Sequence, residues 1–381
     1  MRPALILLAF LAATSAHAQW TLQTSNTTAD LRGIHNIGNG VAWASGTNGT
    51  VLRTEDGGYV WQSCSIPPGA EKLDFRGIQA FDANTAIVMS SGPGDQSRLY
   101  KTTDGCHSWK LIFTNPDPEG FWDAILFTYT HPKYGSGWLL GDPVHGEFAL
   151  YAISDAGEKW SRQENDGLKA MKDKQGAFAA SNSSLIHLEG KIIFGSGGNA
   201  GATIYRETFA FHCIDRCFFC RNGCPKNPHG RRNRWDVQAV PIGGPSQGAG
   251  IFSIAGKDAS AGTVGESTIV AVGGDYTKPN DSNRTAAFSD DSGDHWTASQ
   301  TPPHGYRSAV AYDPSTKSWI TVGPNGTDIS TDDGKNWRAL HPNDALHAPP
   351  DADRNWNALS LPYVAGPHGR IGKLDEAALK H

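Results

Sequence analysis

Short apolar segments that end in Gly or Ser recur along the whole chain, and polar turns separate them. Each segment is only four to six residues long, a length typical of a β-strand and too short for an amphipathic helix. The seven segments are residues 41–46, 86–90, 137–141, 191–195, 268–273, 319–323 and 363–366. The hydrophobic pattern therefore predicts an all-β protein.

A second strand precedes each of these segments and opens on a recurring short sequence. The seven openings are Arg32-Gly-Ile, Arg76-Gly-Ile, Trp122-Asp-Ala-Ile, Gly176-Ala-Phe, Gly250-Ile-Phe, Arg307-Ser-Ala-Val and Trp356-Asn-Ala-Leu. With the strands that follow, each unit holds about four short strands, which is the pattern of a propeller blade. We expect a seven-bladed β-propeller of four-stranded blades.

An octapeptide, Ser/Thr-x-Asp-x-Gly-x-x-Trp, marks the turn at the outer side of the blades. Its Asp and hydroxyl side chains can accept backbone N–H groups of a tight loop, Gly supplies a positive φ, and Trp begins the next strand. Five copies occur, with variations at Cys106 and before Asp155, so we interpret their Asp residues as structural rather than catalytic. The Asp and Trp pairs are Asp56 and Trp61, Asp104 and Trp109, Asp155 and Trp160, Asp291 and Trp296, and Asp332 and Trp337.

Strands led by Trp predict how the ring closes. Such strands begin at Trp20, Trp61, Trp109, Trp160, Trp235, Trp296 and Trp337. The first has no blade before it, and the last unit, from Trp356 to Leu374, has no Trp strand after it. We expect the N-terminal strand to complete the last blade, because this pairing removes the open sheet edges. Residues 19–374 then form one domain, followed by a short tail at 375–381.

Composition agrees with a turn-rich protein, and the net charge does not favour nucleic-acid binding. Of 381 residues, 44 are Gly, nearly 12%, against roughly 7% in an average protein. Trp occurs 12 times. A formal charge of −5 gives no reason to expect a nucleic-acid partner.

The first 18 residues have the features of a secretory signal peptide. A positive head at Arg2 precedes an apolar run over 4–13, and Ala16-His17-Ala18 supplies a small-residue cleavage site. The run is too short to span a bilayer. We expect a secreted or periplasmic protein without a transmembrane segment, in a compartment that permits disulfides.

A Cys-rich stretch interrupts the fourth unit at 207–234, where the octapeptide is missing. It contains Cys213, Cys217, Cys220 and Cys224 with spacing C-x3-C-x2-C-x3-C-P. The first gap is one residue longer than in bacterial ferredoxins, and zinc sites normally separate two Cys pairs by a longer loop. Two disulfides are favoured by an oxidising compartment, a metal site is the alternative, and a reading-frame artefact is a third explanation. We commit to no cofactor and no metal.

The other two cysteines predict a cross-link between neighbouring blades. Cys64 follows Trp61 by three residues, and Cys106 lies inside the octapeptide of the next unit. Both positions fall in the outer parts of adjacent blades. We therefore predict a Cys64–Cys106 disulfide.

The octapeptide copies resemble the Asp-box (BNR) repeat of sialidases and related propellers. The fuller pattern, an Arg-Gly-Ile strand, a Gly-ended strand and Thr54-Glu-Asp-Gly-Gly-Tyr-Val-Trp, is most similar to the photosystem II stability/assembly factor family over about residues 19–374. That resemblance implies an exported, non-catalytic, assembly-factor-like protein that binds a protein partner such as a membrane-protein subunit. We expect a monomer. The alternatives are a periplasmic oxidoreductase and a sialidase-like glycosidase, but the Arg-Ile-Pro motif of sialidases is absent.

Propellers bind ligands where the inner strands start and the loops converge at one end of the channel. Arg and Trp at this end suit recognition surfaces, although pairing between them is the structural alternative. We predict a binding face of Arg32, Arg76, Trp122, Asp123, Arg307, Asn355 and Trp356, with Asp142, Asp275 and Tyr276 as secondary candidates, and no catalytic residue.

Overall fold

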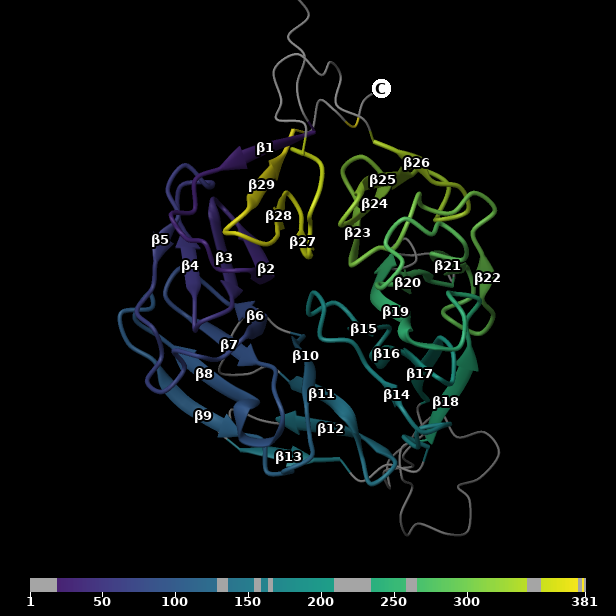
Figure 1. Cartoon of the computed structure of the whole chain (residues 1–381), viewed down its shortest axis with the longest axis horizontal. Helices are drawn as coiled ribbons and strands as arrows, with labels where there is room; N and C mark the ends of the chain where they lie inside the picture. The colour runs from purple at the N-terminus through teal and green to yellow at the C-terminus, as the bar shows by residue number, and fades with distance from the viewer. Residues whose placement is uncertain are drawn as a thin grey trace, which may run out of the picture.

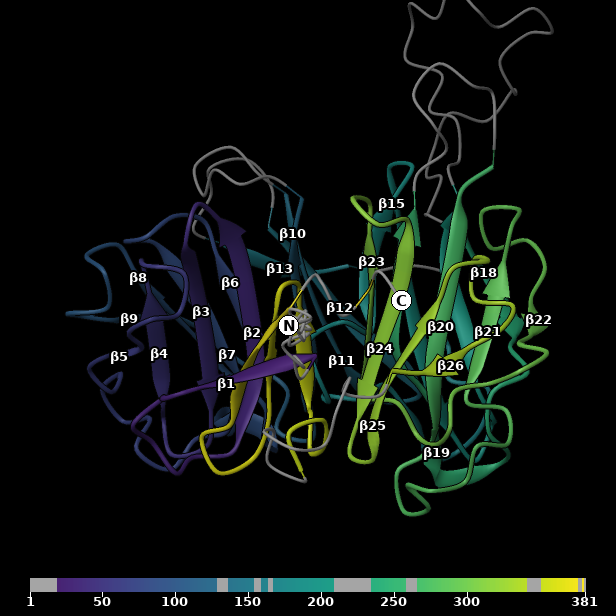
Figure 2. The ribbon, with the colours of Figure 1, turned by 90° about the horizontal axis from the view of Figure 1, so that it is seen from above.

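The computed structural model describes residues 19–128, 136–153, 159–163, 167–208, 234–257, 266–340, 351–375 and 379. Antiparallel sheets stand side by side around a centre, as the two views in Figures 1 and 2 show. The predicted seven-bladed propeller is confirmed. The signal peptide, the four cysteines of the fourth unit, Asp155 and most of the tail lie outside the described residues.

Three blades follow the expected four-strand order before the fourth unit. Blade one holds β2 (Leu31–Gly38), β3 (Val41–Gly46), β4 (Val51–Thr54) and β5 (Gln62–Ser63). Blade two holds β6 (Phe75–Ala80), β7 (Ala86–Ser90), β8 (Arg98–Thr102) and β9 (Lys110–Thr114), with a 3-10 turn at Gly94–Gln96. Blade three holds β10 (Trp122–Phe127), β11 (Gly137–Val144), β12 (Glu147–Ile153) and β13 (Trp160–Arg162).

Three further blades complete the ring on its other side. Blade five holds β19 (Ser246–Lys257), β20 (Thr268–Asp275), β21 (Ala286–Ser289) and β22 (Thr297–Ala298). Blade six holds β23 (Ala309–Asp313), β24 (Ser318–Gly323), β25 (Gly326–Ser330) and β26 (Arg338–Ala339). Blade seven joins β27 (Ala358–Ser360), β28 (Tyr363–Ala365) and β29 (Ile371–Leu374) to β1 (Trp20–Gln23).

Blade four departs from the four-strand pattern. Its inner strand is split into β14 (Gln175–Gly176) and β15 (Leu185–Leu188), which both pair with β16 (Lys191–Gly198), and β17 (Thr203–Thr208) and β18 (Arg234–Ala239) follow. The end of β16 also pairs with β19 of blade five, Gly197 opposite Gly250. A Cβ on Gly197 would lie 2.5 Å from the Cα of Gly250, so glycine allows the two backbones to approach.

The N-terminal strand closes the ring as the sequence predicts. β1 pairs antiparallel with β29, Trp20 opposite Leu374 (Figure 1). The Trp20 indole is 1% exposed, donates a hydrogen bond to Thr327 Oγ1 of blade six at 2.9 Å and packs on Trp356. The first strand therefore ties together the last blade and its neighbour.

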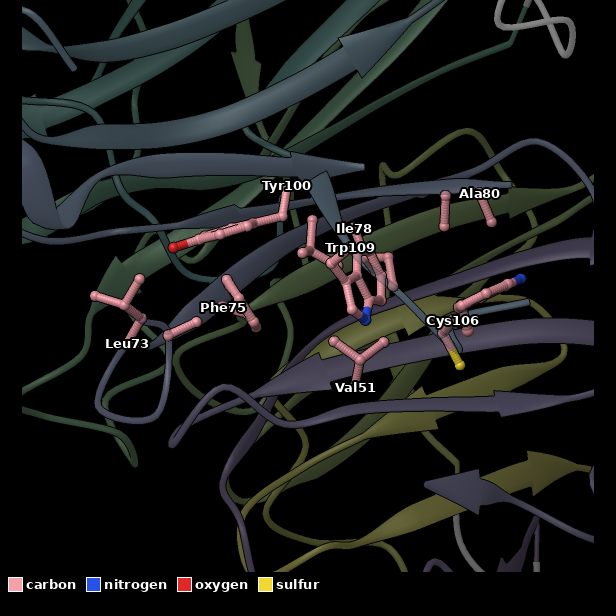
Figure 3. Packing of buried hydrophobic residues seen from close by; sticks show 12 residues of the cluster. Val51, Leu73, Phe75, Ile78, Ala80, Tyr100, Cys106 and Trp109 are labelled. Atoms are coloured by element: carbon pink, nitrogen blue, oxygen red, sulfur yellow. The ribbon is translucent and has the colours of Figure 1, made fainter. Parts of the chain in front are cut away.

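The hydrophobic core lies between neighbouring blades. Figure 3 shows one such cluster, in which Val51 of blade one meets Ile78, Tyr100 and Trp109 of blade two. Each sheet buries both faces in this way, which accounts for the apolar strands with little polar alternation.

The Asp boxes have one geometry in the four copies whose turns are described. In the first, Asp56 Oδ1 accepts hydrogen bonds from the Thr54 hydroxyl at 2.8 Å and the Val60 amide at 3.0 Å. Thr54 Oγ1 accepts the Gly58 amide at 3.0 Å. The boxes of Asp104, Asp291 and Asp332 repeat these bonds. In these copies the carboxylates satisfy turn amides.

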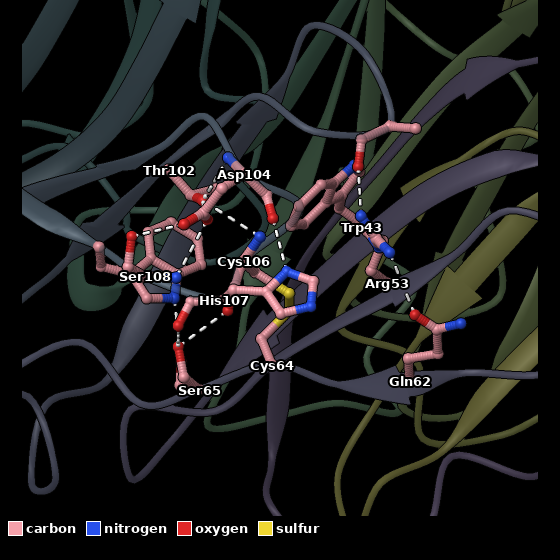
Figure 4. The surroundings of a disulfide bond; sticks show 12 residues. Trp43, Arg53, Gln62, Cys64, Ser65, Thr102, Asp104, Cys106, His107 and Ser108 are labelled. Carbon is pink, nitrogen blue, oxygen red and sulfur yellow. Dashed lines mark hydrogen bonds between the residues drawn. A yellow bond between two sulfur atoms is a disulfide. The ribbon is translucent and has the colours of Figure 1, made fainter.

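A disulfide joins Cys64 to Cys106, the predicted pairing (Figure 4). Cys106 occupies a box position with φ of 66°, where the other boxes have Gly58, Gly293 and Gly334. Ser65, next to Cys64, donates its hydroxyl hydrogen to the Cys106 carbonyl at 2.8 Å. The cross-link therefore fastens the outer strand of blade one to the turn of blade two.

Removing the disulfide is expected to lower the free energy of unfolding by about 2–4 kcal/mol, because the bond closes a loop 42 residues long in the unfolded chain. The double variant Cys64→Ala/Cys106→Gly should lose about 1 kcal/mol less than Cys64→Ala/Cys106→Ala, since glycine tolerates the positive φ. Urea unfolding measures both. Equal stability of the two double variants would contradict the role given to φ.

Asp291→Ala is expected to destabilise the protein by about 1–3 kcal/mol, because His295 and Ser289 lose a charged acceptor. Burial raises the pKa of Asp291, but hydrogen bonds from His295 and Ser289 outweigh burial and lower the pKa to about 2. The contribution of Asp291 is thus present above the unfolded-state pKa and disappears only as the pH falls toward 2. Urea unfolding at pH 7 tests this, with the adjacent exposed Asp290→Ala as the matched control.

Candidate functional site

A cavity of about 690 Å³ opens where the inner strands begin. Its lining comes from all seven blades or the loops beside them and mixes cations, carboxyl groups and aromatic rings. Its charged, aromatic and hydrogen-bonding side chains include Arg32, Arg76, Asp123, Asp142, Lys174, Phe178, Phe252, Tyr276, Tyr306, Ser308 and Asn357. The volume is within the range of small-molecule and peptide sites.

β-Bulges place the lining side chains. The pairing of β2 with β3 skips Arg32, that of β6 with β7 skips Arg76, and that of β10 with β11 skips Asp123. Phe252 of β19 and Asp142 of β11 are skipped in the same way. A bulged residue is unpaired and its side chain is re-aimed. One backbone device therefore delivers two guanidinium groups, two carboxyl groups and one aromatic ring to the cavity.

The residue before each bulge faces the opposite way. Leu31, Phe75, Trp122 and Ile251 precede bulged residues, and each is 0% exposed. Alternation along a strand explains this burial. Inner-strand residues thus alternate between the core and the cavity.

The arginine wall carries excess positive charge. Arg76 Nε donates to Asp74 Oδ2 at 2.8 Å, and its guanidinium also donates to the Ala179 carbonyl at 3.2 Å. Arg32 Nε lies 3.9 Å from the other oxygen of Asp74, beyond hydrogen-bond distance. One carboxylate therefore serves two guanidinium groups, each about one-third exposed. This wall suits an anionic group.

The carboxyl wall belongs to blade three. Asp123 is 1% exposed, and its Oδ2 has no hydrogen-bond partner among the residues that the structure describes. Burial and the nearby Asp142 raise the pKa of Asp123 well above its usual value, and Arg76 opposes this shift. Burial likewise raises the pKa of Asp142 to about 6, although the Ala177 amide, 3.0 Å from Asp142 Oδ1, acts against it. Both carboxyl groups therefore keep their protons to a higher pH than an exposed Asp does.

An aromatic wall in the same cavity comes from blades four to six. The Phe178 and Phe252 rings stack with centroids 3.9 Å apart, and Tyr306 meets Phe252 edge-on at 4.7 Å. Tyr276 is 55% exposed. Burial raises the pKa of Tyr306, and the Arg32 charge opposes this shift, so the aromatic and arginine walls adjoin.

The structure brings six of the predicted residues to this cavity: Arg32, Arg76, Asp123, Asp142, Tyr276 and Trp356. Trp356 borders it with a fully buried side chain. Three other candidates lie elsewhere in the described part of the molecule: Trp122 is in the core, Asn355 borders a groove beside Gly369, and Asp275 borders another beside Lys278.

Arg307 does not face the cavity. It is 0% exposed and donates from Nε to Asp328 Oδ2 at 2.8 Å and from a terminal nitrogen to the Tyr306 carbonyl. The next residue, Ser308, lines the cavity instead. The prediction that Arg307 belongs to the binding face was wrong because the opening Arg307-Ser-Ala-Val is one residue longer than Arg32-Gly-Ile, so Ser308 and not Arg307 corresponds to Arg32.

Sequence reasoning missed Phe178, Phe252, Tyr306, Ser308, Asn357 and Lys174. A signal for some of them was present. Arg32, Arg76 and Asp123 each stand two residues before an Ile, and Ser308 and Asn357 stand two residues before Val310 and Leu359. Aligning the openings on that aliphatic position finds the cavity-facing residues.

No group of three or more His, Cys, Asp or Glu side chains that could hold a metal ion occurs among the described residues. In the same part of the chain, no helix has the length and hydrophobicity needed to cross a membrane.

Comparison with known proteins identifies similar propellers. No protein-family model matches the sequence. The photosystem II assembly lipoprotein Ycf48 of Synechococcus sp. (strain CC9902) is 23% identical over 279 residues, which cover 68% of this chain and 71% of that protein. The similarity confirms the resemblance to the photosystem II assembly factors that the repeat indicates.

Solved structures show the same fold. A structure of YCF48 bound to D1 peptide matches with a TM-score of 0.58 at 17% identity, covering 94% of this chain and 97% of that one. YCF48 from Cyanidioschyzon merolae matches with a TM-score of 0.57 at 18% identity, covering 94% and 100%. The extracellular domain of the putative hybrid two-component system BT4673 from B. thetaiotaomicron has a TM-score of 0.56 at 10% identity, covering 94% of this chain and 40% of that one.

Arg307→Ala is expected to lower the free energy of unfolding by about 3–5 kcal/mol, because it leaves the buried Asp328 carboxylate without its guanidinium partner. Arg32→Ala is the matched control, and we expect it to change stability by less than about 1 kcal/mol. Chemical unfolding of the two variants measures the difference. An Arg307 variant as stable as the Arg32 variant would contradict a structural role for Arg307.

Proposed function

We propose that this chain is an exported propeller that binds a segment of a protein partner in the central cavity and acts as an assembly factor for that partner. The observation that carries the proposal is the large cavity with mixed chemistry at the channel end, in a fold shared with a YCF48 that has been solved with D1 peptide bound. A membrane-protein subunit is the proposed class of partner.

The cavity suits a peptide better than a small uniform ligand. Backbone groups of a peptide need hydrogen-bond partners, and its side chains vary in charge and polarity. The lining offers arginines on one wall, carboxyls on a second and stacked rings on a third. Each wall accepts a different side chain, which allows selection of a particular sequence.

The arginine wall anchors the segment in this proposal. Arg32 and Arg76 share Asp74, so an acidic side chain or a terminal carboxylate would complete their pairing. Binding of an anion here costs little rearrangement, because Arg76 is already held by Asp74 and the Ala179 carbonyl.

Export supports the same proposal. The sequence before Gln19 has the order of a secretory signal peptide. A disulfide between Cys64 and Cys106 is typical of oxidising compartments. The relative from Synechococcus is a lipoprotein. We propose a periplasmic or other extracytoplasmic location, which gives access to exposed segments of membrane proteins.

A glycosidase would need two accessible carboxyl groups in the cavity. Asp123 and Asp142 line it, but they lie next to each other on paired strands of one blade, whereas the two acids of a glycosidase flank the scissile bond. Binding is therefore the function that the geometry favours.

Photo-cross-linking in the native envelope tests the proposal. A benzophenone amino acid replaces Tyr276, which is 55% exposed in the cavity lining, or Tyr59, which is 89% exposed and outside the lining. We expect one envelope protein to cross-link at position 276 and not at 59. Equal products at both positions, or none at 276, would refute binding in the cavity.

Arg32→Ala/Arg76→Ala is expected to reduce recovery of that partner by about tenfold or more, because two charge-assisted contacts are lost. Lys72→Ala/Arg338→Ala removes two exposed cations outside the lining and serves as the charge-matched control. Unchanged capture by the first double variant, with unchanged melting, would remove the arginine wall from the binding face.

A further inference from the structure

Asp123 is a buried carboxyl group with one oxygen that no described residue satisfies. It is 1% exposed, lines the central cavity, and its Oδ2 has no hydrogen-bond partner. An unpartnered buried polar group is costly for folding. A bulge in β10 aims the side chain at the cavity, so a donor from a ligand could supply the missing hydrogen bond.

Asp142 stands beside it on the neighbouring strand and is held in place. Its Oδ1 accepts the Ala177 amide at 3.0 Å, and a Cβ on Gly176 would lie 2.5 Å from that oxygen. Glycine at 176 therefore leaves room for the carboxyl. Asp142 also borders a second cavity of about 490 Å³, so it is reached from two sides.

The aromatic wall continues from this pair. Ala177, which contacts Asp142, is followed by Phe178, and Phe178 stacks on Phe252. Aromatic faces attract organic cations, and so do carboxylates. Two independent features thus favour the same kind of ligand group at one end of the cavity.

We propose that Asp123, Asp142 and the adjoining aromatic rings form a subsite for the basic side chain, Lys or Arg, of the bound segment. The inference rests on the proposed function and adds to it the charge pattern of the ligand. The segment would place an acidic group against Arg32 and Arg76 and a basic group against Asp142 and Asp123.

Other charged groups surround the subsite. The charge of Arg76 on β6 opposes the rise that burial and Asp142 cause in the pKa of Asp123. Lys174 and Asp142 both line the cavity, and Arg32 lines it from β2. The second cavity, which Asp142 also borders, is lined by Glu119, Lys172 and Asp173. A basic ligand group pairs with the charged form of these acids, so binding depends on ionisation of the carboxyl pair.

The sign of the pH dependence follows from the raised pKa values. The carboxyl of Asp142, with a pKa of about 6, is mostly ionised at pH 7.5 and mostly neutral at pH 5.5. Affinity for a cation is therefore expected to fall about fourfold between these two values. Binding should be accompanied by proton release, because the cation favours the charged form of the pair.

Ethylguanidinium is the probe, and ethylurea is its neutral isostere. The full chain, labelled with ¹³C at the Asp carboxyl carbons, is titrated with each by NMR at pH 7.5 and 5.5. We expect ethylguanidinium, and not ethylurea, to shift the Asp142 and Asp123 resonances, more weakly at the lower pH. Equal shifts with both probes, or no shift at pH 7.5, would overturn the subsite.

Two variants locate the response. Asp142→Asn is expected to abolish it, whereas Asp173→Asn, an exposed acid bordering only the second of the two cavities, should preserve it. Asp123→Asn should weaken the response at least threefold while leaving the melting temperature equal or higher at pH 8, because the raised pKa means that ionisation of Asp123 destabilises the fold there. A lower melting temperature with an unchanged response would make Asp123 structural and overturn its part.

The cross-linking and NMR results separate the two proposals. Capture of a partner at position 276 without a cation-specific shift keeps the proposed function and overturns the subsite. A cation-specific shift that Asp142→Asn abolishes, with no partner captured, keeps the subsite and overturns the assembly-factor role.

Discussion

Burial of both faces of every sheet is the constraint on which this structure depends. A single blade exposes two apolar surfaces, and only a neighbour on each side covers them. The cluster of Val51 with Ile78, Tyr100 and Trp109 is one such interface. Because the demand for a neighbour ends only when the ring is complete, β1 must join β29, and Trp20 reaches across to Thr327 of blade six.

The outer rim and the inner cavity use different side chains and so vary independently. At the rim, Thr54 and Asp56 satisfy turn amides, and Cys64–Cys106 adds a covalent tie. At the centre, Arg32 and Asp123 are unpaired bulge residues whose identity the ladder does not dictate. Substitutions at bulges can therefore change what the cavity binds at little cost to the interfaces between blades.

The sequence predicts the repeat, the ring closure and the disulfide well, because each follows from local patterns that recur. It predicts the cavity less well. Trp122 and Asp123 are adjacent, yet only Asp123 faces the cavity, because the bulge decides the direction of each side chain. The two positions can be told apart in the sequence only when the inner strands are aligned on the aliphatic residue, here Ile125. Arginine is a common binding residue, but Arg307 lies in the core. Neither its residue type nor its place in the repeat indicates that it pairs with Asp328, 21 residues away. The split inner strand of blade four depends on contact with β19, which local sequence does not encode.

Asp123 is a carboxyl group that folding alone does not explain. Asp328 is buried with Arg307 as its partner, and Asp56 and Asp332 accept turn amides, so these carboxylates have structural reasons to be present. Asp123 has none: burial and Asp142 raise its pKa, and its Oδ2 is unpartnered. If the residue at position 123 had only to stabilise its blade, an uncharged residue would suffice, such as the Ser at 308 or the Asn at 357. A carboxyl at a position where its ionisation opposes folding is typical of a group that serves a ligand, and in our proposal it gives the bulge residues a charge pattern that favours one partner sequence.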